Sequence, residues 1–170
     1  NPRTWLDIAS NDGTLLSYTP QNAFRVGVDP IKFLCEEAKQ HANLVINDFF
    51  PVKEMPVVEF DVITSISCFY DMDDPNAFVA GARDVLAEDG VWTIQQNYLL
   101  PTMELGAIDN FCHEHLEYYT LLSLEPLLAR HGLEVIDVQT SMVNGGSIRT
   151  IVAHKGAFPV QDSVEKQRTI

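Results

Sequence analysis

The segment Thr4 to Gly13, TWLDIASNDG, decides the fold class. It begins with a short apolar run that contains one acid, Asp7, and this pattern predicts a buried β-strand. The Asn-Asp-Gly sequence that follows is typical of a turn, and a helix is expected from about Thr14. A strand that leads through a short loop into a helix is the first part of a β–α–β unit. The segment therefore favours an α/β fold with a parallel sheet.

The rest of the chain continues this alternation. We expect further strands at 24–28, 44–46, 60–67, 91–96, 133–140 and 147–153, helices at 31–41, 75–87 and 121–131, and a mixed loop and helix insertion at 100–116. Pro75 is expected to begin one helix, and Gly90 to stop it. The last two strands are joined too tightly for a helix, so they form an antiparallel pair, with the final strand beside the fifth or at the sheet edge. The prediction is a Rossmann-like, doubly wound, seven-stranded mixed sheet with a C-terminal antiparallel hairpin.

The charge of the chain excludes two classes of partner. The sequence has 170 residues, the length of one domain. Lys plus Arg number 11 and Asp plus Glu number 24, which gives a formal charge of −13. This field repels phosphate-rich polymers and anionic lipid surfaces, so we expect neither a nucleic acid nor a membrane as partner. No apolar run approaches the roughly 18 residues that a membrane span needs.

The cysteines indicate a reducing environment. Cys35, Cys68 and Cys112 are widely spaced and form neither a disulfide framework nor a CxxC metal motif. A cytoplasmic location is therefore expected. The chain starts at Asn1 without an initiator Met, and we expect a piece of a longer protein, with one domain at 1–156 and a polar tail or linker at 157–170.

Acidic side chains accompany three successive predicted strands. Asp7 lies in the first, Asp29 follows the second 22 residues later, and Asp48 follows the third. Ligands of open α/β sheets bind beyond the carboxyl ends of the strands. There, a carboxylate after the second strand is placed to accept the hydroxyls of a ribose, and Asp48 is placed to accept from an adenine amino group.

The first loop argues against a nicotinamide dinucleotide. A dinucleotide loop has the pattern GxGxxG, but this loop has only Gly13, with Ala9 and Asn11 where other glycines are expected. The nearby acids also repel a diphosphate, whereas S-adenosylmethionine has a ribose, an adenine, a sulfonium and an amine but no phosphate. S-Adenosylmethionine is therefore the predicted cofactor. The predicted cofactor-binding residues are Asp7, Ala9, Asn11, Gly13, Asp29, Pro30, Asp48 and Ser67.

Each of these acids also has a structural interpretation. Asp12 is suited to cap the helix that begins at Thr14, and Asp29 to cap the helix at 31–41, which is compatible with ribose contact. Asp48 has the weakest case for a ligand. The acids at positions 71, 73 and 74 are expected mainly to form a solvated loop and a helix cap.

Two sets of motifs carry a family resemblance. DIASNDGTLL at 7–16, RVGVDP at 25–30 and INDFF at 46–50 resemble the first three motifs of class I S-adenosylmethionine-dependent methyltransferases. DNFCHEHLEYY at 109–119 and VNGGSIR at 143–149 resemble a narrower family, the sugar C-methyltransferases that act on nucleotide-linked keto-sugars. These share an HEH-x-x-YY stretch and a later GGS-x-R stretch, and the likeness extends over essentially the whole chain.

The resemblance implies roles for the second motif set. His115 matches the general base, Glu114 would support it, and Tyr118 completes the predicted catalytic set. The expected acceptor is a small molecule, possibly a nucleotide-linked sugar in this family. Flanking domains of the same parent chain are expected, namely a small zinc domain before this region and an α/β domain after it. The chain departs from the family at Cys112, where Tyr is common, at Asn144, where His is common, and at 95–97, where Glu-x-Pro is replaced by Gln-Gln-Asn.

The chemistry of carbon methylation supports a histidine as general base, independently of the resemblance. Methylation of carbon requires removal of a proton next to a carbonyl, and a base with a near-neutral pKa does this best. A tyrosine at 98, 118 or 119 is a candidate donor to the enolate oxygen.

No metal site is expected, because His113 and His115 are two residues apart and the spacing HExxH is absent. His113 is expected to be hydrogen-bonded in the core. The alternatives are an O- or N-methyltransferase of another metabolite and a non-catalytic nucleoside-binding module.

Overall fold

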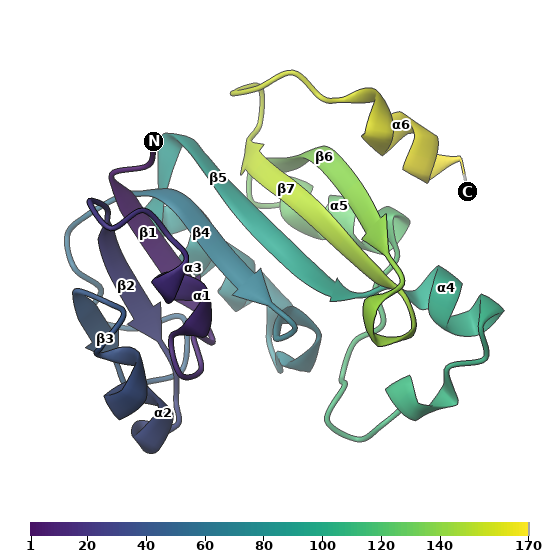
Figure 1. Ribbon diagram of the computed structural model, residues 1–170. Helices are drawn as coiled ribbons and strands as arrows, with labels where there is room; N and C mark the ends of the chain where they lie inside the picture. The colour runs from purple at the N-terminus through teal and green to yellow at the C-terminus, as the bar shows by residue number, and fades with distance from the viewer. Residues whose placement is uncertain (170) are drawn as a thin grey trace.

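The computed structural model describes residues 1–169, which form one seven-stranded sheet in the order β3-β2-β1-β4-β5-β7-β6 (Figure 1). The strands are β1 (Thr4–Ile8), β2 (Phe24–Val28), β3 (Leu44–Ile46), β4 (Phe60–Ile66), β5 (Leu86–Asn97), β6 (Leu133–Ser141) and β7 (Ser147–His154). The helices are α1 (Thr14–Ser17), α2 (Lys32–Ala38), α3 (Pro75–Val85), α4 (Leu99–Glu104), α5 (Leu121–Ala129) and α6 (Asp162–Arg168), with 3-10 turns η1 (Phe69–Asp71), η2 (Ile108–Asn110) and η3 (Val143–Gly145).

The strand order confirms the doubly wound architecture. β1 to β5 are parallel, and β7 is antiparallel to both of its neighbours, β5 and β6. The final strand is thus inserted beside the fifth, one of the two arrangements expected. From β1 the chain winds outward through β2 and β3, and from β4 it winds in the opposite direction to β5. The order therefore reverses between β1 and β4, which is where ligands of such sheets bind.

An aromatic core joins the sheet to α3 and α5, which pack against each other on one face. Phe69 contacts the rings of Phe78, Trp92 and Tyr119, with centroid distances of 5.3, 5.9 and 5.1 Å. The indole of Trp92 is fully buried and donates to the Ser65 hydroxyl at 2.8 Å, so its single polar atom is satisfied. Large aromatic side chains of this kind dominate core stability, and their packing fixes η1 directly after β4.

The ends of α3 show one confirmed and one wrong expectation. Asp74 caps the helix by accepting the Ala77 N–H at 3.0 Å, and Pro75 occupies its first turn. The helix ends at Val85, however, and Gly90 lies within β5 instead of stopping the helix. A Cβ on Gly90 would lie 2.7 Å from the carbonyl oxygen of Phe60. Glycine is required there because the two strands approach closely at an irregularity in their pairing.

The segment expected as a tail or linker contains an ordered helix. α6 packs against β6 beside the end of the sheet (Figure 1), and Val164 is fully buried there. The Gln167 amide donates to the Tyr98 hydroxyl at 2.9 Å, and the Arg168 guanidinium pairs with Glu125 of α5. The boundary at residue 156 stays a prediction, but residues 162–168 are part of the packed structure. Over residues 1–169, none of the helices is long and apolar enough to cross a membrane.

Candidate active site

Backbone strain is concentrated at the carboxyl edge of the sheet. The non-glycine residues recorded with a left-handed φ are Ala9, Asn11, Ser67 and Asn144, at φ between 51° and 59°. The first two follow β1, Ser67 follows β4, and Asn144 lies between β6 and β7, whose junction is at the same edge. Such conformations cost about 1–3 kcal/mol each and gather at ligand sites. The structure therefore brings the predicted Ala9, Asn11 and Ser67 to one edge.

Gly13 has a packing role in this loop. Its φ is +81°, and a Cβ would lie 2.9 Å from the Ala38 Cα in α2. Close approach of a loop to a neighbouring helix is one of the functions of glycine in nucleotide-binding loops. Asp12 accepts the N–H of Thr14 at 2.9 Å, but the expectation that it caps α1 is wrong, because the N-cap residue is Gly13. Neither residue needs a ligand to explain its position.

Asp29 connects the loops that follow β1 and β2. It is 5% exposed, and its two carboxylate oxygens accept the N–H groups of Asn11 at 3.0 Å and Ile31 at 2.8 Å. Each carboxylate oxygen can accept a further hydrogen bond, so the group keeps capacity for ribose hydroxyls. The expectation that Asp29 caps α2 is wrong, because the N-cap residue is Ile31. Pro30 is exposed beside it.

Asp7 is a buried carboxyl at the same edge. It is 3% exposed, and its Oδ1 accepts the Thr64 hydroxyl at 2.5 Å. Burial raises the pKa of Asp7 to about 7, the Thr64 hydrogen bond opposes this, and the Asp29 charge adds to it. Without a ligand the carboxyl is therefore about half protonated at neutral pH. A cation placed beside it would favour the ionised form.

Asp48 lies apart from this pair of acids. It is exposed, and its carboxylate accepts the N–H of Phe49 at 2.8 Å. Its neighbour Asn47 is also exposed, but its side-chain amide donates to the carbonyl of Asp29 at 3.0 Å. The predicted adenine contact of Asp48 therefore has no support from burial or from a shared hydrogen bond, and it stays a prediction.

The residues present fit an adenosyl ligand with a positive charge. Asp29 offers spare acceptor sites for a ribose, and Asp7 offers a carboxyl whose charge a sulfonium or ammonium group would stabilise. The loop at 9–14 contains no Lys or Arg that would neutralise a diphosphate. Both the geometry and the charge of this edge therefore suit S-adenosylmethionine better than a dinucleotide.

The histidine segment is held against the end of β4. The N–H groups of Leu116 and Glu117 both donate to the Tyr70 carbonyl, at 3.0 and 2.9 Å. The Tyr70 ring contacts the His115 ring edge to face, with centroids 4.5 Å apart. In Figure 1 the connection between α4 and α5 accordingly lies beyond the arrowheads of β4 and β5. His115 thus reaches the same edge as Asp7 and Asp29.

A hydrogen bond fixes the tautomer of His115. Its Nδ1 lies 2.8 Å from the carbonyl oxygen of Asn110, and the ring is partly buried. Because a carbonyl oxygen can only accept, Nδ1 carries the proton. In the neutral ring Nε2 then has a free lone pair. This is the arrangement that a general base requires.

Asp71 is an acid whose pKa responds to the charge of His115, whereas the supporting role of Glu114 stays a prediction. Glu114 is 74% exposed and pairs at 3.8 Å with His113, which is 92% exposed, so the expected burial of His113 is wrong. Among the described residues, no hydrogen bond joins Glu114 to His115. Asp71 has a buried Oδ1 without a hydrogen-bond partner. Burial raises the pKa of Asp71, the charge of His115 opposes this shift, and Glu114 adds to it.

The tyrosines near this edge differ in whether their hydroxyl groups are paired, buried or accessible. Tyr118 stacks on Phe111 with centroids 4.9 Å apart, and its hydroxyl is 3.5 Å from the Cys112 carbonyl. Tyr98 is already paired with α6 through its hydroxyl. Burial raises the pKa of Tyr119, whose buried hydroxyl has no partner within the described chain. Tyr118 therefore remains the tyrosine closest to solvent in this loop.

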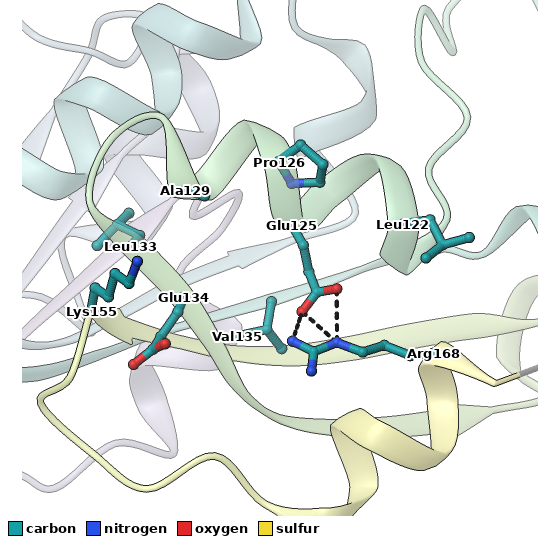
Figure 2. A pocket seen from close by; sticks show the side chains of 9 residues that line it. All are labelled: Leu122, Glu125, Pro126, Ala129, Leu133, Glu134, Val135, Lys155 and Arg168. Carbon is teal, nitrogen blue, oxygen red and sulfur yellow. Dashed lines mark hydrogen bonds and ion pairs between the residues drawn. The ribbon is translucent and has the colours of Figure 1, made fainter.

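A groove elsewhere on the molecule contains none of these residues. It has a volume of about 480 Å³ and lies between α5, the amino end of β6 and α6, with the Glu125–Arg168 ion pair across it (Figure 2). Because β6 runs parallel to β5, this position is at the edge opposite the predicted site. In the range 1–169, no group of three or more His, Cys, Asp or Glu side chains is arranged to bind a metal ion.

Comparison with known proteins identifies the family. Residues 1–138 match the methyltransferase domain family. The chain is 30% identical over 158 residues to the C-methyltransferase NovU of Streptomyces niveus, covering 89% of this chain and 38% of NovU. It thus spans well under half of that curated relative. The chain belongs to the methyltransferase domain family, and S-adenosylmethionine is the cofactor of this class.

Solved structures confirm the class I methyltransferase fold. The plantazolicin methyltransferase BpumL, in complex with a pentazolic desmethylPZN analogue and SAH, superimposes with a TM-score of 0.72 and 16% identity over 91% of this chain and 77% of its own. An O-methyltransferase from a Brevibacillus brevis multienzyme, in complex with S-adenosyl-L-homocysteine, gives a TM-score of 0.74 and 12% identity over 99% and 72% of the two chains. The predicted Rossmann-like mixed sheet and its antiparallel end are therefore confirmed.

Proposed function

We propose that this chain is the catalytic domain of an enzyme that transfers the methyl group of S-adenosylmethionine to a carbon atom of a small molecule, most specifically a nucleotide-linked keto-sugar. The free lone pair on His115 Nε2 carries this proposal, because methylation of carbon needs a base. The likeness to a C-methyltransferase supports the carbon acceptor. The sugar rests on the HEH and GGS motifs at 113–115 and 145–147.

Two acids would hold the cofactor. The Asp29 carboxylate accepts the ribose hydroxyls with the lone pairs that Asn11 and Ile31 leave free. The Asp7 carboxyl loses its proton and stabilises the positive end of the ligand. When bound, S-adenosylmethionine supplies a methyl group on a positively charged sulfur, and its transfer leaves S-adenosylhomocysteine.

His115 would begin the reaction at the acceptor. Its Nε2 takes the proton from the C–H next to the carbonyl, and the carbon keeps the electron pair that forms the new bond to the methyl group. A positioned base of this kind contributes about 10²–10⁴-fold to the rate. The Asn110 carbonyl keeps its bond to Nδ1 throughout, and the Asp71 carboxylate stabilises the imidazolium that forms. Tyr118 is the candidate donor to the enolate oxygen.

Proton exchange tests the base separately from methyl transfer. The protein is incubated in D₂O with S-adenosylhomocysteine and a nucleotide-linked keto-sugar, and deuterium at the carbon next to the carbonyl is followed by mass spectrometry. We expect exchange with the native protein, at least about 10²-fold slower exchange with His115→Ala, and native exchange with the exposed control His113→Ala. Equal exchange by His115→Ala would refute the role of His115.

The position of the transferred methyl group tests the acceptor. With ¹³C-methyl-labelled S-adenosylmethionine, the product is expected to show the NMR shift of a methyl bound to carbon. A methyl bound to oxygen or nitrogen would contradict the proposal and establish the alternative metabolite methyltransferase. Binding of the cofactor without turnover of any keto-sugar would instead indicate a nucleoside-binding module.

A further inference from the structure

The side chain of Asn110 joins three elements at the active edge. Its Oδ1 accepts the Asn97 amide at the end of β5, at 3.3 Å. Its Nδ2 donates to the carbonyl of Asn144 in the β6–β7 connection at 3.0 Å, and to the Thr102 hydroxyl of α4 at 3.4 Å. The backbone carbonyl of the same residue accepts the His115 ring. One residue therefore connects the histidine to β5, α4 and the β6–β7 connection.

The β6–β7 connection is shaped to meet Asn110. Gly145 has a φ of +74°, and a Cβ there would lie 2.9 Å from the Ala107 Cβ and 3.1 Å from the Asn110 Nδ2. A Cβ on Gly146 would lie 2.5 Å from Pro101 in α4. Two glycines are thus needed for the close approach, and Asn144 presents its carbonyl from a left-handed conformation.

We propose that Asn110 is a positioning residue that holds His115 with Nδ1 protonated and Nε2 free, and that it makes the VNGGS segment part of the catalytic apparatus. This inference rests on the proposed function of His115 as the base. The proposal requires one tautomer of His115, because a histidine with its proton on Nε2 cannot accept a proton there. The Asn110 carbonyl stays in place to accept the Nδ1 proton only while the Asn110 side chain is held by its own hydrogen bonds.

Loss of this anchor should affect the chemical step and spare cofactor binding. The ring of His115 would keep its edge contact with Tyr70 but lose a fixed acceptor for Nδ1, and its position relative to the acceptor carbon would relax. Displacements of about 1 Å can reduce the rate by about 10²-fold. The cofactor acids Asp7 and Asp29 are held by Thr64 and by backbone amides, not by Asn110. The expected signature is therefore a lower kcat with an unchanged KM for S-adenosylmethionine.

Imidazole NMR tests the proposal without any turnover. In the full chain labelled with ¹⁵N-histidine, the His115 signals, assigned by their loss in His115→Gln, should show the proton on Nδ1. In Asn110→Ala they should change to a mixture of tautomers. The control Asp109→Ala removes an exposed neighbour in the same turn and should leave the signals unchanged. An unchanged Nδ1-protonated ring in Asn110→Ala would overturn the proposal.

Kinetics and a second variant complete the test. Asn110→Ala should lower kcat about tenfold to a hundredfold, with S-adenosylhomocysteine affinity preserved as evidence of folding. Gly145→Ala displaces Asn110 from the other side, so the double variant should lose much less than the product of the two single losses. Independent, multiplicative losses would contradict the connection through Asn110. If Asn110→Ala alters the tautomer but His115→Ala retains activity, the positioning holds and the proposed base is wrong.

Discussion

The protonation of Asp7 should control how tightly this protein binds S-adenosylmethionine. Burial raises the pKa of this carboxyl to about 7 in the protein alone, with the Asp29 charge adding to the shift and the Thr64 hydroxyl opposing it. The sulfonium and ammonium groups of the ligand favour the ionised form and so lower this pKa. Binding should therefore release a proton from Asp7, and affinity should rise with pH through neutrality.

The size of the effect follows from the pKa of Asp7. With a pKa of about 7, the carboxyl is about one-tenth ionised at pH 6 and about nine-tenths ionised at pH 8. If the ligand binds only the ionised form, the association constant rises about tenfold over this range, which corresponds to about 1.4 kcal/mol. The ligand's own amine also titrates, at a pKa of about 7.7–8.0, so the comparison needs a protein control.

Calorimetric titration with S-adenosylmethionine from pH 6 to pH 8 makes this comparison. Asp7→Asn removes the titrating group but keeps an oxygen for the Thr64 hydroxyl, and the ligand's own titration cancels in the ratio of the two affinities. The native protein's advantage over the variant should grow about tenfold from pH 6 to pH 8. A ratio that is the same at both pH values would refute the assignment of Asp7 to the positive end of the cofactor.

Two further predictions concern stability. Because the folded pKa of Asp7 is raised above its ordinary value of 3.8, the stability that this group contributes at low pH is lost as the pH rises through about 7. Asp7→Asn should therefore be the more stable protein above pH 7, by up to about 4 kcal/mol, and lose this advantage near pH 4; urea unfolding at both pH values checks it. Gly13→Ala should destabilise the fold by about 1–3 kcal/mol, because it combines a left-handed φ with a Cβ 2.9 Å from the Ala38 Cα. An unchanged thermal midpoint for Gly13→Ala would contradict this packing role.

The parallel half of the sheet could be predicted because its strands are short apolar runs. The predicted ranges 24–28 and 44–46 coincide with β2 and β3. The prediction failed where one residue type can play two different structural roles. Gly90 can stop a helix or allow strands to approach, and only the position of the Phe60 carbonyl decides between them. α6 was missed because its sequence is polar, and Val164 alone marks its buried side.

Site residues were predictable where topology alone places them. Asp7 and Asp29 come together because the carboxyl ends of neighbouring parallel strands share one edge. Asp71 and Asn110 were missed because their importance depends on contacts with segments distant in sequence. Asp71 looks like one acid in a solvated loop until Tyr70 is seen to hold the histidine segment. The signal available for Asn110 was its place within the motif that contains His115.

Binding of S-adenosylhomocysteine to the native protein and to Asp29→Asn tests the central claim most directly. The substitution replaces one of two accepting oxygens with an NH₂ group, so it should weaken binding at least about tenfold, the cost of one hydrogen bond to a charged group. Reduced nicotinamide dinucleotide should bind neither protein. Failure of the native protein to bind S-adenosylhomocysteine, equal affinity in Asp29→Asn, or preferential binding of the dinucleotide would contradict the account.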